Sequence, residues 1–254
     1  MAPIKLTLAT LATCAVGALA AQNQLVQVTN FGSNPTNVKI YTYRPNGLVA
    51  NPALIVAMHY CTGTAQAYFT GTQYANLADN YKSFMIIYPS APDSGGCWDV
   101  HSTETLTHDR GGDSLGIASA VRYAIQNYGV PKNKVFMTGS SSGAMMTNVL
   151  AGAYPDLFVA GAAFAGVPYA CFAGSGMWNS QCAQGQSSKT AQQWVRRQPI
   201  RAVDNPQNRW LFYRETSFAV VIRAIQASVP ACRSGTEPSN VALADLANPS
   251  DASV

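Results

Sequence analysis

The sequence has little charge and no apolar run of membrane-spanning length, and each of these two shortages excludes a class of protein. It also has no internal repeat. Only 11% of the 254 residues are charged, and the net charge of +4 is small. A nucleic-acid-binding protein needs a basic face, so we expect no nucleic-acid partner. A membrane helix needs about 20 consecutive apolar residues, so we expect no membrane span. The 48% of apolar side chains instead predicts one compact globular domain.

The first twenty residues have the features of a secretion signal. Lys5 supplies a positive charge, residues 6–15 are apolar but too few to cross a bilayer, and Ala18-Leu19-Ala20 is a small-x-small cleavage site. The alternative is a short buried helix, which the polar run at residues 22–24 disfavours. We therefore expect a signal peptide at residues 1–20 and a secreted, extracellular protein.

Cysteines outside this leader are expected to form disulfides, because a secreted protein folds in an oxidising compartment. Cys171 and Cys182 bracket a short loop, and Cys61 and Cys97 each follow an apolar run. Pairing Cys61 with Cys97 and Cys171 with Cys182 is the simplest of three connectivities. It leaves Cys232 unpaired.

Strand-like and helical patterns alternate along the chain. Apolar runs bounded by turn residues predict buried strands at residues 38–43, 53–58, 84–88, 135–138 and 159–164. Helical spacing of apolar residues predicts helices at residues 65–81, 113–127 and 142–154. The alternation predicts an α/β fold with a mostly parallel sheet flanked by helices. Catalytic groups in such folds gather beyond the carboxyl ends of strands, which is where residues 59–63 and 139–143 fall.

Residues 139–143 read Gly-Ser-Ser-Ser-Gly and fit the G-x-S-x-G motif, in which two glycines leave room for a sharp turn that presents the central serine. This short pattern also occurs by chance as an ordinary Ser/Gly turn. Here it follows the strand-like residues 134–138 and opens the amphipathic residues 144–150, as the motif requires. We therefore predict Ser141 as a catalytic nucleophile.

Acyl transfer also needs hydrogen-bond donors for the developing oxyanion. The backbone N–H after the nucleophile, that of Ser142, is the first, and the loop at residues 59–63 is the natural source of the second. His59 ends a predicted buried strand, where ordering the loop by hydrogen bonds is a commoner role for histidine than catalysis.

Three strings of residues make a family resemblance specific. They are His59-Tyr60-Cys61-Thr62-Gly63-Thr64-Ala65, Ser94-Gly95-Gly96-Cys97-Trp98-Asp99-Val100, and residues 139–148. With residues 178–182, they resemble the fungal acetylxylan esterases of carbohydrate esterase family 1, whose feruloyl esterases are close relatives. The likeness runs from about Gln24 to Gln192.

The resemblance implies an α/β-hydrolase fold with Ser141 as nucleophile and the backbone N–H groups of Cys61 and Ser142 as the oxyanion hole. It implies hydrolysis of acetyl esters on xylan through an acyl-enzyme, with acetylated xylan or a related plant cell-wall polysaccharide as partner. It implies no metal and no organic cofactor. We expect a monomer. Trp98 and Trp178 lie in loops where a tryptophan can stack on a sugar or cap the edge of the core.

No general base follows Ser141 in the chain. The fold's usual order is serine, acid, histidine, but His59, His101 and His108 all precede Ser141. His101 and His108 lie in a polar loop where a solvated histidine needs no special role. Asp204 and Asp245 do not follow strand-like runs, so we assign neither an acid nor a base.

The composition changes near Gln193. Seven of the ten arginines lie beyond this position, with no lysine and no histidine. We interpret residues 21–192 as an incomplete esterase domain and residues 193–254 as a divergent Arg-rich tail. The hypothesis is a faulty reading frame or an unspliced intron, with the C-terminal part of the fold missing or wrong. Sequencing of cDNA tests it.

Three functions remain open at the level of sequence. The first is a secreted esterase that removes acetyl groups from xylan. The second is a feruloyl esterase, which needs an apolar slot for a phenolic ring. The third is a non-catalytic carbohydrate-binding paralogue that lacks the base.

Overall fold

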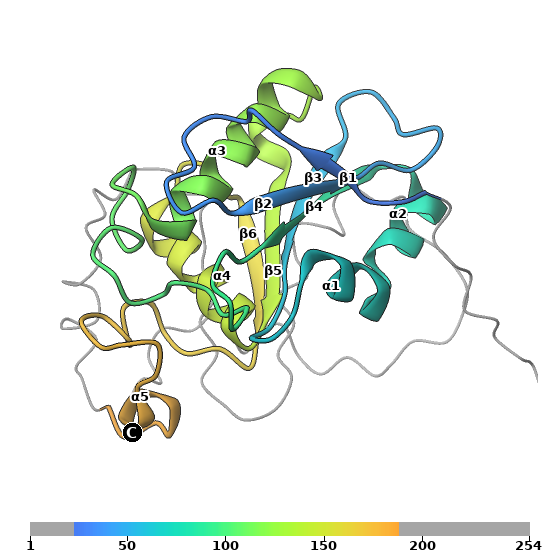
Figure 1. The fold of residues 1–254 in the computed structure, drawn as a ribbon. Helices are drawn as coiled ribbons and strands as arrows, with labels where there is room; N and C mark the ends of the chain where they lie inside the picture. The colour runs from blue at the N-terminus through green and yellow to red at the C-terminus, as the bar shows by residue number, and fades with distance from the viewer. Residues whose placement is uncertain (1–22, 188–254) are drawn as a thin grey trace, which may run out of the picture. The chain divides into compact units, whose positions relative to one another are not determined.

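The computed structural model describes residues 23–187, which form a six-stranded sheet with helices on both faces (Figure 1). The strands are β1 (Val26–Val28), β2 (Lys39–Tyr43), β3 (Ala53–Met58), β4 (Phe84–Ser90), β5 (Val135–Ser140) and β6 (Ala160–Phe164). They lie in the order β1-β2-β4-β3-β5-β6. The mostly parallel α/β sheet predicted from the sequence is confirmed.

The four strands β4, β3, β5 and β6 pair in parallel, whereas β1 and β2 are antiparallel additions to one side. The prediction of a mostly parallel sheet did not say which strands run antiparallel, and the structure shows that they are β1 and β2. A parallel connection needs a crossover of a dozen or more residues, usually with a helix. Residues 44–52 between β2 and β3 are too few and contain no helix, so the chain reverses there. Strand β1 was not predicted.

Helices α1 (Ala65–Gly71) and α2 (Tyr74–Tyr81) replace the single helix predicted at residues 65–81. The break comes at Thr72, whose backbone is extended, with φ −127° and ψ 163°. The Thr72 hydroxyl donates to the carbonyl of Tyr68 at 2.7 Å and so satisfies one of the last carbonyls of α1. Apolar periodicity did not reveal this interruption, because Tyr68 before the break and Ala75 after it are both buried, as in one continuous amphipathic helix.

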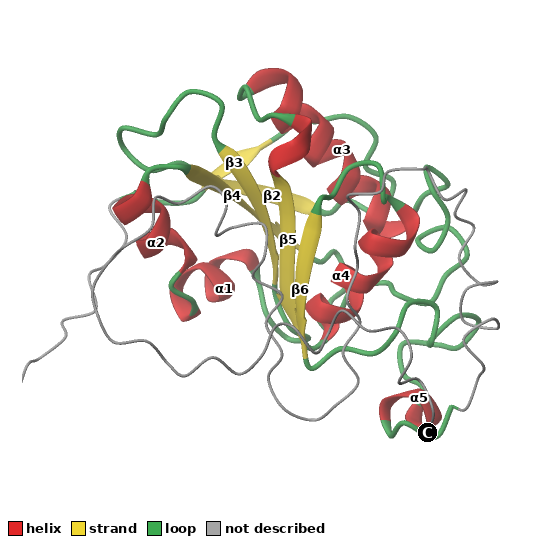
Figure 2. Ribbon diagram, turned by 180° about the vertical axis from the view of Figure 1, so that it is seen from behind, coloured by secondary structure: helices red, strands yellow, loops and turns green. Residues whose placement is uncertain are grey.

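Helices α3 (Gly112–Asn127) and α4 (Ser142–Ala153) cover the sheet face opposite to α1 and α2, as both views show (Figures 1 and 2). Two short helices, η1 (Lys132–Lys134) and α5 (Ser180–Ala183), complete the described part. The central strands β3 and β4 are buried on both faces, in agreement with their unbroken apolar sequence. This rigid centre places the ends of β3 and β5 side by side.

Two predictions from the sequence lie outside the described residues. They are the signal peptide at residues 1–20 and the tail at residues 193–254, which includes Cys232. The two predicted cysteine pairs, Cys61–Cys97 and Cys171–Cys182, are disulfides in the structure. Among residues 23–187 no helix is long and apolar enough to cross a membrane.

Candidate active site

Ser141 stands alone between strand β5 and helix α4, in a backbone conformation that side-chain-bearing residues rarely adopt. Its φ is 53° and its ψ is −117°. Its N–H donates to the carbonyl of Phe164 on β6 at 2.8 Å, and its carbonyl accepts from Met145 in the first turn of α4 at 3.0 Å. These bonds hold the strained residue between strand and helix, and its side chain is exposed. Strain of this kind is typical of a serine presented for chemistry.

The two glycines of the motif are required by close packing. A Cβ on Gly139 would lie 2.3 Å from the carbonyl oxygen of Gly143, and a Cβ on Gly143 would lie 2.2 Å from that of Met58. Any side chain at either position would push α4 away from the ends of β3 and β5. The glycines therefore allow the first turn of α4 to reach the loop after β3.

Two backbone N–H groups near this turn are unpaired. Within the described residues, neither the Cys61 N–H nor the Ser142 N–H donates a hydrogen bond. The neighbouring groups are occupied, because the Thr62 N–H donates to Gly95 at 2.9 Å and the Gly63 N–H to Tyr60 at 3.0 Å. Ser142 also begins α4, where the helix dipole favours negative charge. The pair has the chemistry needed to hold an oxyanion.

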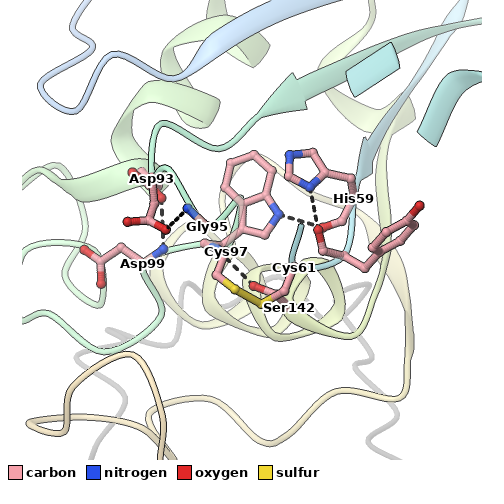
Figure 3. The surroundings of a disulfide bond; sticks show 10 residues. His59, Cys61, Asp93, Gly95, Cys97, Asp99 and Ser142 are labelled. Carbon is pink, nitrogen blue, oxygen red and sulfur yellow. Dashed lines mark hydrogen bonds between the residues drawn. A yellow bond between two sulfur atoms is a disulfide. The ribbon is translucent and has the colours of Figure 1, made fainter. Parts of the chain in front are cut away.

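The loop at residues 59–63 is fastened on several sides (Figure 3). A disulfide joins Cys61 to Cys97. The indole of Trp98 donates to the carbonyl of His59 at 2.8 Å, and this tryptophan is only 1% exposed. Trp98 therefore caps the core beside the disulfide and cannot stack on a sugar. Trp178, in contrast, is 68% exposed, and its indole donates to Ser180 at 3.0 Å.

His59 is fully buried, and both of its ring nitrogens are engaged. Nδ1 lies 2.7 Å from the carbonyl oxygen of Tyr60, and Nε2 accepts from the N–H of Ala91 at 3.0 Å. These partners fix a neutral ring with its proton on Nδ1. Burial lowers its pKa and outweighs the opposite effect of the bond to Tyr60. The role of ordering the loop therefore fits His59, and no ring nitrogen is free to accept a proton from Ser141.

The other two histidines also lack a contact with Ser141 in the described part of the chain. His108 Nδ1 lies 2.7 Å from the carbonyl oxygen of Ala153, at the last residue of α4. The 12 residues of α4, at about 1.5 Å each, separate it from Ser141 by about 18 Å. His101 Nδ1 lies 3.2 Å from a carboxylate oxygen of Asp99. No hydrogen bond joins either ring to the serine.

Two features of the site were missed by sequence reasoning. The phenol of Tyr68 lies 3.0 Å from the hydroxyl oxygen of Ser140, which precedes the proposed nucleophile. Buried Asp113 in the first turn of α3 accepts from the N–H of Asp99 at 2.9 Å, and burial raises the pKa of its carboxyl. Both contacts join residues that are distant in the chain, so no local sequence pattern predicts them. Among residues 23–187 no cluster of three potential metal ligands is present.

Comparisons with known proteins give one consistent result. The family model Esterase PHB depolymerase matches residues 39–187. Acetylxylan esterase A of Emericella nidulans is 56% identical over 176 residues, which cover 68% of this chain and 58% of that protein. Acetylxylan esterase A of Aspergillus oryzae is 55% identical, with 67% of this chain and 57% of that protein covered. The chain thus spans little more than half the length of these curated relatives.

A solved structure has the same fold. The acetyl xylan esterase from Aspergillus awamori is 47% identical and superimposes with a TM-score of 0.67. The alignment covers 76% of this chain and 69% of that one. This likeness confirms the α/β-hydrolase fold predicted from the three sequence strings, and the relatives confirm the resemblance to acetylxylan esterases.

Proposed function

Because the chain belongs to the Esterase PHB depolymerase family, we propose that it hydrolyses carboxylic esters with Ser141 as the nucleophile. The observation that carries the proposal is the exposed, strained Ser141 beside two unpaired N–H groups. In the proposed reaction, the Ser141 oxygen attacks the ester carbonyl and forms a tetrahedral intermediate. The N–H groups of Cys61 and Ser142 bind its negative oxygen, and the bond to the alcohol oxygen breaks as that oxygen takes up the proton given up by Ser141. Water then cleaves the acyl-Ser141 ester: its OH completes the carboxylic acid and its other hydrogen returns to the Ser141 oxygen.

The proposed substrate is acetylated xylan. Support comes from the relatives from Emericella nidulans and Aspergillus oryzae, both named acetylxylan esterases. The alternative within the same class is a feruloyl ester. The proposed location is outside the cell, which the two disulfides support because thiols stay reduced in the cytosol.

One group needed for fast turnover has no candidate in the described residues. A serine hydroxyl is a weak nucleophile until a base accepts its proton. His59 is held neutral by two hydrogen bonds, and His108 lies at the far end of α4. This observation favours a second candidate function, a carbohydrate-binding protein that has the esterase fold but does not turn substrate over.

An assay of the 254-residue chain on p-nitrophenyl acetate, acetylated xylan and a feruloyl ester separates these functions. The proposal expects release of acetate that is abolished in Ser141→Ala and retained in Ser33→Ala, which changes an exposed serine away from the site. An esterase that lacks a triad member works roughly 10⁴- to 10⁶-fold below a complete one. Activity should therefore be measured at high enzyme concentration.

Three results go against the proposal in different ways. Equal rates in wild type and Ser141→Ala remove Ser141 from the chemistry. Retention on acetylated xylan in affinity electrophoresis, with no ester cleavage, establishes the binding function. Faster cleavage of the feruloyl ester than of the acetyl esters would change the proposed substrate but not the proposed reaction.

A further inference from the structure

Residues 95–98 form a bridge between the two N–H groups assigned to the oxyanion. On one side the bridge is attached to the loop that carries the Cys61 N–H. Cys97 is bonded to Cys61, and the carbonyl of Gly95 accepts from the Thr62 N–H at 2.9 Å. The contact is close, because a Cβ on Gly96 would lie 2.9 Å from the carbonyl oxygen of Gly63. The bridge and the loop therefore move together.

On the other side the bridge is attached to helix α4. The main-chain N–H of Trp98 donates to the hydroxyl oxygen of Ser142 at 2.9 Å. Both residues are buried, at 1% and 3% exposure. Figure 3 shows Ser142 beside the disulfide, with the dashed bond running to the backbone that follows Cys97. The hydroxyl of Ser142 thus makes a tertiary contact and does not cap its own helix.

Oxyanion stabilisation depends on where the two donors are held. The donors work when both lie about 2.7–3.1 Å from the negative oxygen, and they cost no reorganisation only if they are fixed beforehand. Cys61 and Ser142 lie on different elements, after β3 and at the start of α4. The bridge is bonded to each of these residues directly, through the disulfide and through the hydroxyl.

We propose that the side-chain hydroxyl of Ser142 is a positioning group, which acts through the Trp98 N–H and residues 95–97 to set the separation of the two oxyanion donors. The inference rests on the proposed function, since it assigns a second role to a residue of that site. The backbone N–H of Ser142 contacts the substrate oxygen, whereas its hydroxyl contacts only the bridge.

The test compares three variants of the full chain. Ser142→Ala removes the acceptor of the Trp98 bond. Ser142→Thr keeps a hydroxyl and is the rescue. Ser114→Ala is the matched control, because Ser114 is also a buried serine in the first turn of a helix. Its hydroxyl donates to the carbonyl of Thr105 in a neighbouring loop at 2.6 Å. Ser114 lies on α3 and contacts neither donor.

Two readouts separate positioning from simple stability. The first is kcat and KM for p-nitrophenyl acetate. Ser142→Ala should lower kcat about 10- to 100-fold with KM unchanged, which is less than the ~10²–10³ caused by deleting a donor. The second is amide hydrogen exchange of residues 59–63, measured by mass spectrometry. Exchange at Thr62 and Gly63 should become faster in Ser142→Ala, and both effects should be reversed in Ser142→Thr.

The exchange readout decides the inference even if the chain hydrolyses no ester. Faster exchange in Ser142→Ala but not in Ser114→Ala supports the positioning role. Absence of turnover then counts only against the proposed function. Unchanged exchange, or an equal increase in Ser114→Ala, overturns the inference whatever happens to kcat. If Ser142→Ala does not fold, a Cys61→Ala/Cys97→Ala pair breaks the other attachment of the bridge. It should give the same faster exchange at Thr62 and Gly63, and unchanged exchange overturns the inference.

Discussion

The phenol oxygen of Tyr68 on α1 lies 3.0 Å from the hydroxyl oxygen of Ser140, the last residue of β5. Tyr68 is 3% exposed, and burial raises its pKa to about 12. At neutral pH the phenol therefore keeps its proton and cannot serve as the base for Ser141. Its role is to anchor the end of β5, directly before the turn that presents the serine.

Tyr68→Phe should therefore reduce stability and leave the chemistry intact. Loss of one buried hydrogen bond should lower the free energy of unfolding by about 1 kcal/mol. The rate of ester hydrolysis and its pH profile should stay within about two-fold of wild type. Urea titration and the p-nitrophenyl acetate assay measure both, with Tyr81→Phe, which is 53% exposed, as control. A rate that loses its dependence on pH in Tyr68→Phe would give the phenol a chemical role.

Ser141→Gly should stabilise the fold while it removes the nucleophile. The conformation at φ 53° and ψ −117° costs a side-chain-bearing residue about 1–3 kcal/mol, and glycine adopts it freely. The extra chain entropy of glycine offsets roughly 0.5–1 kcal/mol of the gain. Chemical denaturation should therefore place Ser141→Gly above both wild type and Ser141→Ala. Ser33→Gly, at a residue without positive φ, should show no gain. A Ser141→Gly protein less stable than wild type would show that the backbone at Ser141 is not strained.

The sequence predicted the turn well because its requirements are local. Gly139, Ser141 and Gly143 lie within five residues, and the flanking strand and helix have their own apolar periods. The five predicted strands are all present for the same reason. Local patterns also predicted both disulfides within residues 23–187, because each cysteine follows an apolar run or brackets a short loop.

Apart from the Cys61–Cys97 disulfide, sequence patterns failed where a contact joins distant residues. The bond between Tyr68 and Ser140 spans 72 positions, and the bond between Trp98 and Ser142 spans 44. Neither tyrosine nor serine spacing signals such a partner. The break at Thr72 depends on one hydroxyl bond to Tyr68, which an average over apolar residues does not register. The direction of β2 followed from the length of the next connection, not from the strand itself.

His59 should make the fold less stable as the medium becomes acidic. Its folded pKa lies below the ordinary value of 6.5, so the folded state binds fewer protons than the unfolded state as the pH falls below 6.5. The contribution of His59 to stability is complete above this pH and is lost progressively below it. One proton limits the slope to about 1.4 kcal/mol per pH unit.

Denaturation of wild type and His59→Gln at a series of pH values measures this contribution. The slope below pH 6.5 should be smaller in the variant, because glutamine does not titrate. A carbon-13 NMR titration of labelled histidine should also give His59 a pKa below 6.5, with the signal assigned by its absence from His59→Gln. Equal slopes in the two proteins, or a His59 pKa at or above 6.5, would contradict the buried neutral ring.

The disulfide between Cys171 and Cys182 should stabilise the fold without affecting the oxyanion donors. It closes a loop of 11 positions, for which chain entropy gives about 3 kcal/mol, whereas the 36 positions between Cys61 and Cys97 give about 4 kcal/mol. A Cys171→Ala/Cys182→Ala pair should therefore unfold earlier in urea but keep wild-type exchange at Thr62 and Gly63. The Cys61→Ala/Cys97→Ala pair should change both. The two disulfides lie in different places but contribute similar stabilisation. If exchange at Thr62 and Gly63 became faster in both double variants, the exchange would report lost stability and not a displaced donor.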